Sequence, residues 1–141
     1  MKRNIYGAFA MLAAALIVSV PFAQAQSRVK AEVPFAFSLQ DKAMPAGNYQ
    51  IIAQSDRVLE VWNLDARHGQ LLAKQMSVQS SKEESPKLVF HKYGDQYFLS
   101  AIWYGDGHYG VGFAESKREK EVKMAGNALP NTPETVIVAM K

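Results

Sequence analysis

The strongest constraint on the fold is an alternation of apolar and polar residues that begins at Val29. From Val29 to Phe37, every odd-numbered position is apolar and most even-numbered positions are polar or small. Successive side chains of a β-strand point to opposite faces of the sheet, so this period of two predicts a half-buried strand. Pro34 belongs to the outward-facing set and cannot donate a ladder hydrogen bond. It therefore predicts an edge strand or a bulge at this position.

Further strand-like segments follow, separated by turn residues. The sequence predicts strands at about residues 48–54, 58–64, 70–78, 87–92, 96–104 and 135–140. Pro45 and Gly47 are typical of a turn before the second strand, and Tyr93-Gly94-Asp95 is typical of a tight hairpin. This succession predicts an antiparallel arrangement of neighbouring strands.

Residues 96–104 are expected to form the most central strand, because both faces of that segment are largely apolar. Strict alternation divides its side chains into two sets. One face is expected to carry Tyr97, Leu99, Ala101 and Trp103, and the other Phe98, Ser100, Ile102 and Tyr104.

The pattern changes after residue 112, where a short helix is predicted at about residues 117–125. Ser116-Lys117-Arg118-Glu119 matches a capping box, and Gly126 lies where a helix C′ glycine is expected. Glu119 and Lys123 have the i,i+4 spacing of an ion pair on one helix face. We therefore predict an all-β fold, a single antiparallel barrel or sandwich of about seven strands with one short C-terminal helix.

Residues 1–25 have the three-part organisation of a cleavable signal peptide. Lys2 and Arg3 form the positive start, and residues 8–20 are apolar except for Ser19. Ala23-Gln24-Ala25 presents the small residues that a signal peptidase requires. The apolar run is shorter than the roughly 20 residues that a membrane-spanning helix needs, so cleavage after Ala25 is favoured over a retained anchor.

Cleavage would leave residues 26–141 as a single β domain, exported to the periplasm or the extracellular space. We expect membrane contact only through the signal peptide before its removal. Of the 141 residues, 116 would remain, which is enough to bury a core.

The amino-acid composition narrows the range of possible functions. The chain has no cysteine, which excludes disulfides, thiolate catalysis, thiolate metal sites and lipid attachment to a cysteine. It has 16 basic and 13 acidic residues; without Lys2 and Arg3 these become 14 and 13, a net charge of +1. Nucleic-acid binding needs a concentrated basic face, so no nucleic-acid partner is predicted.

The glycine-rich residues 105–112 match the G-x-G-x-x-G pattern of dinucleotide-binding folds. Only 29 residues follow Gly112, too few for the repeated βαβ units of such a fold. No Gly-Lys-Ser/Thr ends the stretch as in a P-loop. We therefore interpret it as a flexible or bulged β connection and predict no cofactor.

Aromatic residues beside these glycines form the candidate ligand-binding set: Trp103, Tyr104, His108, Tyr109 and Phe113. Aromatic faces stack on sugars and on apolar ligands. The alternative interpretation is that some of the rings fill the core and the others cover a neighbouring loop. The predicted function is that of an exported, non-catalytic binding or structural protein of the bacterial cell envelope. Its partner would be an apolar or glycan ligand, or an envelope protein.

Two other functions stay open. A hydrolase or metal-dependent enzyme could use His91 or His108, provided that the fold brings carboxylates to them. His68, His91 and His108 lack helical i,i+4 spacing, and no G-x-S-x-G elbow is present, so no catalytic or metal-binding residue is predicted. The third possibility is an interaction module that pairs through the edge strand containing Pro34.

Four motifs occur together: Val33-Pro34-Phe35-Ala36-Phe37, Met44-Pro45-Ala46-Gly47-Asn48-Tyr49, the run from Leu88 to Leu99 that ends in Tyr97-Phe98-Leu99, and Ser116-Lys117-Arg118-Glu119. As a set they resemble a family of small exported bacterial all-β proteins with no assigned function. The resemblance spans most of the chain after residue 25, although the stretch before the helix is richer in glycine than in that family. It implies no activity and no functional residues.

Overall fold

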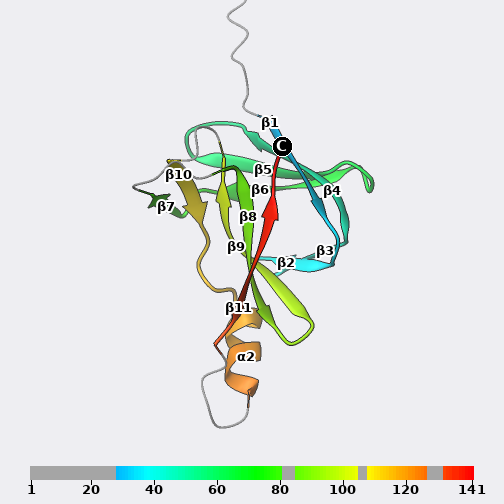
Figure 1. Cartoon of the computed structure of the whole chain (residues 1–141), viewed down its shortest axis with the longest axis vertical. Coiled ribbons are helices and arrows are strands. Elements are labelled where there is room, and N and C mark those ends of the chain that lie inside the picture. The colour runs from blue at the N-terminus through cyan, green and yellow to red at the C-terminus, as the bar shows by residue number, and fades with distance from the viewer. Residues whose placement is uncertain (1–27, 81–84, 105–107, 127–131) are drawn as a thin grey trace, which may run out of the picture.

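The computed structural model describes residues 28–80, 85–104, 108–126 and 132–141. They form two β-sheets and one short helix (Figure 1). The predicted signal peptide, residues 1–25, lies outside the described residues, so its cleavage stays a prediction. Within the described ranges, no helix is both long enough and apolar enough to span a membrane.

The first sheet has four strands in the order β1-β4-β5-β6, and each pair of adjacent strands is antiparallel. They are β1 (Arg28–Val33), β4 (Gly47–Ala53), β5 (Val58–Asn63) and β6 (His68–Ala73). The edge position of β1 confirms the prediction made from Pro34, which follows this strand and is exposed.

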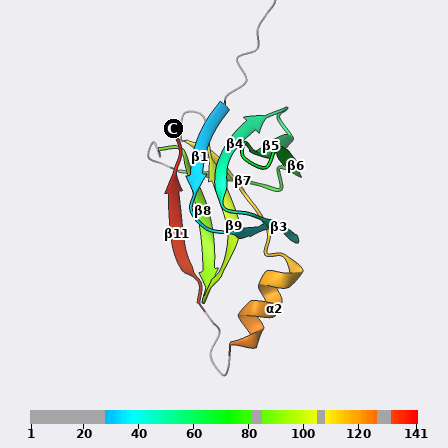
Figure 2. The same ribbon diagram turned by 90° about the vertical axis from the view of Figure 1, so that its right-hand side faces the viewer.

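The second sheet has seven strands, five of them in the order β11-β8-β9-β10-β7. Its members are β2 (Phe37–Leu39), β3 (Lys42–Met44), β7 (Met76–Gln79), β8 (Lys87–Tyr93), β9 (Gln96–Trp103), β10 (Tyr109–Gly112) and β11 (Glu134–Ala139). The short strands β2 and β3 pair with each other, and β2 joins β9 through one parallel bridge, Ser38 to Phe98. Helix α2 (Lys117–Ala125) lies beyond one end of this sheet (Figure 2).

The described residues form eleven strands where about seven were predicted, and part of the difference arises because the chain passes from one sheet to the other. The predicted strand 29–37 is broken at Pro34, so that β1 joins the first sheet and β2 the second. The predicted strand 70–78 is broken at Lys74 and Gln75, which separates β6 from β7. The short strands β3 and β10 form in segments expected to be turn or loop. The all-β class and the single short helix are confirmed for the described residues. Their two sheets do not close into a barrel and are consistent with a sandwich.

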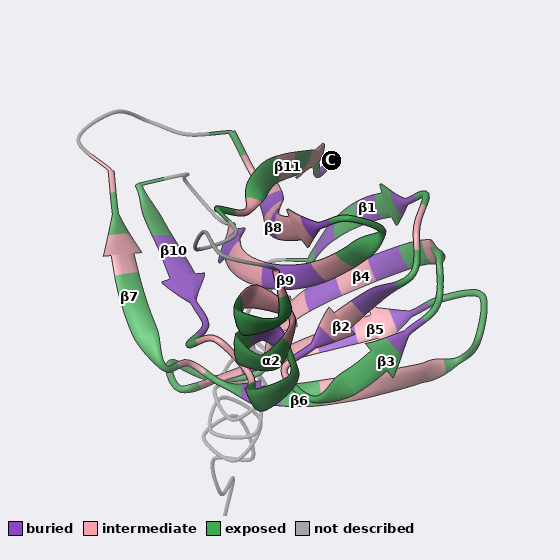
Figure 3. Ribbon diagram, turned by 90° about the horizontal axis from the view of Figure 1, so that it is seen from below, coloured by how far each residue is buried: buried purple, intermediate pink, exposed green. Residues whose placement is uncertain are grey.

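The core fills the space between the two sheets. Val29, Ala31 and Val33 are buried and alternate with exposed residues along β1, as predicted. Figure 3 shows buried positions on strands of both sheets, whereas α2 is largely exposed. The remaining members of the core cluster are Phe37, Leu39, Met44, Tyr49, Ile51, Leu59, Val61, Leu72, Leu88, Phe90, Leu99, Ile102, Val111, Phe113 and Met140.

Strand β9 lies in the middle of the second sheet, as predicted, but its alternation is interrupted. Val89 of β8 pairs with Ala101, whereas the next residue of β8 pairs with Leu99, so Ser100 is an extra residue in a β-bulge. Leu99 and Ile102 were expected on opposite faces. The bulge brings both into the core, and the prediction of strict alternation was wrong at this point.

Helix α2 spans residues 117–125, as predicted, and Ser116 caps it. The Ser116 hydroxyl accepts a hydrogen bond from the Glu119 N–H at 3.1 Å. Two details differ from the prediction. Gly126 has a φ of −67°, so it does not form a left-handed cap. Lys123 pairs with Glu115 at 2.7 Å instead of Glu119, because the Glu119 side chain turns towards the sheet.

Candidate functional site

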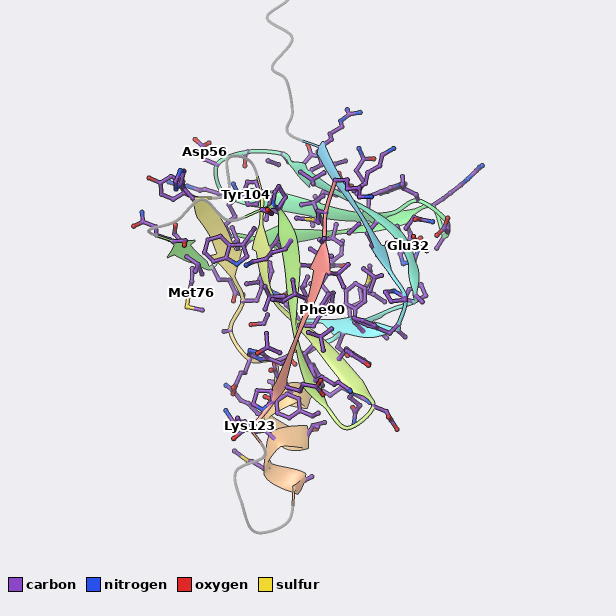
Figure 4. The ribbon with its side chains drawn as sticks, viewed as in Figure 1. Glu32, Asp56, Met76, Phe90, Tyr104 and Lys123 are labelled. Carbon is purple, nitrogen blue, oxygen red and sulfur yellow. The ribbon has the colours of Figure 1, made fainter. Side chains whose placement is uncertain are left out.

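An open hollow of about 350 Å³ lies beside β7 and β10, at a margin of the space between the sheets. Its lining residues come from strands of the second sheet and from connections next to both sheets: Asp56, Lys74, Met76, Ser77, Tyr104, Tyr109, Gly110 and Val111. Figure 4 shows Asp56, Met76 and Tyr104 on the same side of the molecule. The hollow therefore joins residues that are up to 55 positions apart in the sequence.

The two tyrosines reach the hollow because of strand pairing. Ile102 of β9 and Val111 of β10 are paired, and both belong to the core. Tyr104 lies two residues after Ile102 and Tyr109 two residues before Val111, so both extend the inward-facing set. Tyr104 packs against the core, whereas Tyr109 is 54% exposed. The hollow thus has one anchored ring and one ring in contact with water.

Charged side chains complete the rim. The Lys74 Nζ atom lies 5.2 Å from the centre of the Tyr104 ring, which is within the range of a cation–π interaction. Asp56 comes from the turn between β4 and β5. The Lys74 N–H donates to the Arg57 carbonyl at 2.9 Å and so holds that turn next to the start of β7. One cation and one anion are thereby placed beside two phenol rings and the Ser77 hydroxyl.

Three of the five predicted ligand-binding residues do not line this hollow. Trp103 is adjacent to Tyr104 in the chain and so points to the opposite face, where its ring packs over Gly110 and beneath the Lys87 Nζ atom, 5.8 Å away. Phe113 is buried in the core. His108 is exposed, and its carbonyl accepts from the Ser80 N–H at 3.1 Å. The structure brings together only Tyr104 and Tyr109 of the predicted set. Residues 105–107 of the glycine-rich stretch lie outside the described residues.

Sequence reasoning did not identify Asp56, Lys74, Met76 or Ser77 as site residues. Asp56 comes from the β4–β5 turn, Lys74 from the connection between β6 and β7, and the other two from β7. The prediction treated residues 70–78 as one strand, which left no reason to place Lys74 at a rim. A polar pair interrupting that segment, Lys74-Gln75, was the available signal.

A second polar cluster lies between α2 and the second sheet. The His91 Nδ1 atom is 2.8 Å from the Glu119 Oε1 atom, and the Tyr93 hydroxyl donates to the same oxygen at 3.3 Å. Burial, together with the Glu119 and Glu115 carboxylates, raises the pKa of Tyr93 to about 12, so the hydroxyl keeps its proton. Glu119 is buried, and these contacts attach the helix to β8.

This cluster is the histidine–carboxylate contact that the enzyme hypothesis required of His91. His68 lies at the start of β6 in the first sheet, and His108 precedes β10. Within the described ranges, no group of three or more His, Asp or Glu residues is placed to hold a metal ion. The contacts of Glu119 account for the packing of α2 against the sheet.

Comparison of the chain with protein-family models, with curated proteins and with solved structures finds no match. The resemblance to small exported bacterial proteins therefore stays a prediction from the four motifs.

Proposed function

We propose that the protein is an exported, non-catalytic β-sandwich of the bacterial cell envelope that binds a glycan in the hollow at Tyr104 and Tyr109. The observation that carries this proposal is the meeting of two tyrosine rings with Lys74 and Asp56 around an open hollow. Export rests on the signal-peptide pattern of residues 1–25, and the site of action would be the periplasm or the extracellular space.

The chemistry of the rim supports a glycan over a purely apolar ligand. A sugar ring offers a C–H face that stacks on an aromatic side chain and hydroxyl groups that hydrogen-bond to charged groups. Tyr109 supplies an exposed face, and Asp56 and Lys74 supply an acceptor and a donor. A purely apolar ligand would leave both charged groups without a partner on the ligand, and core side chains already occupy the space between the sheets.

Each side chain then has a distinct role in binding. Tyr109 would stack on the sugar face and lose water from its exposed ring. Tyr104, fixed against the core and beneath Lys74, would form the floor. Lys74 would donate to a ligand hydroxyl, and the Asp56 carboxylate would accept from another.

Isothermal titration calorimetry of the exported, purified protein against a panel of oligosaccharides from bacterial envelopes tests this function. We expect one class to bind, and Tyr109→Ala to weaken binding by about tenfold or more, which corresponds to roughly 1.4 kcal/mol. Trp103→Ala is the matched control, because Trp103 is also aromatic but lies on the opposite face of the sheet. Binding that is unaffected by Tyr109→Ala, or lost equally in Trp103→Ala, would overturn the assignment of the hollow.

The export part of the proposal has its own test. Mass spectrometry of the protein recovered from the periplasm or the medium should give a chain that begins at Gln26. A chain that keeps residues 1–25 would contradict cleavage without bearing on the hollow.

A further inference from the structure

The two sheets approach each other along a seam between β1 and β11. The Lys30 N–H donates to the Lys141 carbonyl at 2.9 Å, and the Lys141 N–H donates to the Lys30 carbonyl at 2.8 Å. These two bonds join β1 to the end of the chain that follows β11. The strands then separate (Figure 1). A hollow of about 510 Å³ beside them is bordered by Ala31 and Val138. From Glu134 to Ala139, no described strand pairs with β11 on the side away from β8.

The two edges differ in how they are protected. In β1, the exposed positions carry Lys30 and Glu32, and Pro34 follows, which are features that discourage pairing with another strand. In β11, residues 135–139 carry no charge, and Thr135, Val136, Ile137 and Val138 are β-branched. Such an edge is a template for an additional strand.

Backbone direction shows which groups that strand would meet. The Met140 N–H donates to Pro86, beside β8, whereas the N–H and C=O of Lys141 face β1. These directions alternate along a strand, so the N–H and C=O of Thr135, Ile137 and Ala139 point away from β8. The same segment carries the Ile137 side chain, which is 57% exposed.

Ile137 also ends an apolar row that crosses the outer face of the second sheet. Successive cross-strand pairs link Ile137 to Val89, Val89 to Ala101, Ala101 to Gly112, and Gly112 to Met76. Cross-strand neighbours share one face, so these five residues form a continuous row without a charged member. A strand added beside β11 would extend this row and cover Ile137.

We propose that β11 pairs antiparallel with β11 of a second copy of the chain, about a twofold axis at Ile137. The two Ile137 residues would face each other, and Thr135 of each copy would face Ala139 of the other. Isologous pairing of this kind is self-complementary and closes as a dimer. The hollow beside Ala31 and Val138 gives space for the start of the added strand.

The distribution of charge favours a second copy in this orientation. The only charged residue of β11 is Glu134 at its start; its carboxylate lies 3.1 Å from the Lys92 Nζ atom of β8, and its side chain is still 67% exposed. Lys141 follows the end of β11, and Lys30 lies next to Lys141. Antiparallel pairing places Glu134 of each copy near Lys141 of the other. A parallel arrangement would place like charges together.

The absence of cysteine from the sequence makes disulfide trapping a clean test of this dimer. Under oxidising conditions, Ile137→Cys should form a covalent dimer, because identical residues at the twofold axis of an antiparallel pair lie within disulfide range. Thr135→Cys is the control: it lies on the same strand and face, but its two copies would be on opposite sides of the axis, well beyond the ~7 Å limit.

Analytical ultracentrifugation of the purified protein gives an independent measurement. We expect a concentration-dependent dimer whose dissociation constant rises at least about tenfold in Ile137→Lys. Leu71→Lys should leave the dimer unchanged, since Leu71 is equally apolar and 61% exposed but lies on β6, at the edge of the other sheet. A protein that stays monomeric and forms no Ile137→Cys disulfide would overturn the proposal. The edge of β11 would then be a candidate binding site for a strand of a different protein.

Discussion

The Nδ1 atom of His91 lies 2.8 Å from the Oε1 atom of Glu119, and this contact joins β8 to helix α2. Glu119 is the only buried residue of the helix, with 4% of its surface exposed. The Tyr93 hydroxyl donates to the same oxygen. The helix is therefore held on the sheet by a buried carboxylate and its two partners more than by an apolar face.

Replacing Glu119 with alanine should lower the free energy of unfolding by about 1–3 kcal/mol, because the buried Tyr93 hydroxyl and the half-buried His91 ring would lose their partner. Glu121→Ala is the control, since Glu121 is an exposed glutamate on the same helix, and it should change stability by less than about 0.5 kcal/mol. Urea denaturation measures both. Equal effects of the two substitutions would show that the buried contacts do not hold the helix.

The ionisation of Tyr93 predicts a loss of stability at alkaline pH. Burial is the largest reason that its pKa is raised from 10.0 to about 12, followed by the neighbouring carboxylates. Because the folded pKa lies above the unfolded value, the contribution of Tyr93 is complete below pH 10 and is lost as pH rises towards 12. Ultraviolet absorbance of tyrosinate should show a late step that is smaller by one tyrosine in Tyr93→Phe. A titration without that step in the parent protein would contradict the prediction.

Features that depend on near neighbours in the chain were predictable from the sequence. Ser116 caps α2 because the N–H that it accepts is only three residues away. Pro34 marks an edge because proline lacks the N–H that a ladder needs. The position of Glu119 in the capping box was also predicted, but its contact with His91 joins residues 28 positions apart and required the tertiary structure.

The bulge at Ser100 shows what local pattern could not provide. Nothing in residues 96–104 marks an extra residue, because the pairing with β8 decides where it falls. The candidate site also has residues that the sequence indicated and residues that only the tertiary structure brings together. The clustering of aromatic residues pointed to Tyr104 and Tyr109, whereas Asp56 and Lys74 join them only because the first sheet packs against the second.

The Tyr49 hydroxyl is expected to stabilise the turn that precedes β4. It donates to the Pro45 carbonyl four residues earlier, and Tyr49 is fully buried. This arrangement resembles the tyrosine corner of β-sandwiches and gives a structural reason for the Pro-Ala-Gly-Asn-Tyr motif. Burial raises the pKa of Tyr49, which keeps the hydroxyl a donor.

Tyr49→Phe should therefore cost about 1–3 kcal/mol of unfolding free energy, because the Pro45 carbonyl loses its donor. Tyr109→Phe removes an exposed hydroxyl and should cost less than about 0.5 kcal/mol. Thermal and urea denaturation of the two variants measure the difference. A Tyr49→Phe variant as stable as Tyr109→Phe would show that the hydroxyl does not hold the turn.

Gly47 is the position where the turn before β4 tolerates no side chain. Its φ is +151°, and a Cβ atom built there would lie 2.7 Å from the Asp65 Oδ2 atom. That oxygen accepts a hydrogen bond from the Asn48 N–H, also at 2.7 Å, so displacing Asp65 would break a contact between β4 and the turn after β5. Alanine at this position would combine backbone strain with a lost hydrogen bond.

We expect Gly47→Ala to lower the free energy of unfolding by at least about 2 kcal/mol, since strain alone costs about 1–3 kcal/mol. Gly94→Ala is the matched control: φ is +59° in the β8–β9 hairpin, and a Cβ atom there would meet no atom within 4 Å. That variant should cost about 1 kcal/mol, from the left-handed conformation alone. Urea denaturation would contradict this account if Gly94→Ala proved as destabilising as Gly47→Ala, because the contact with Asp65 would then contribute nothing.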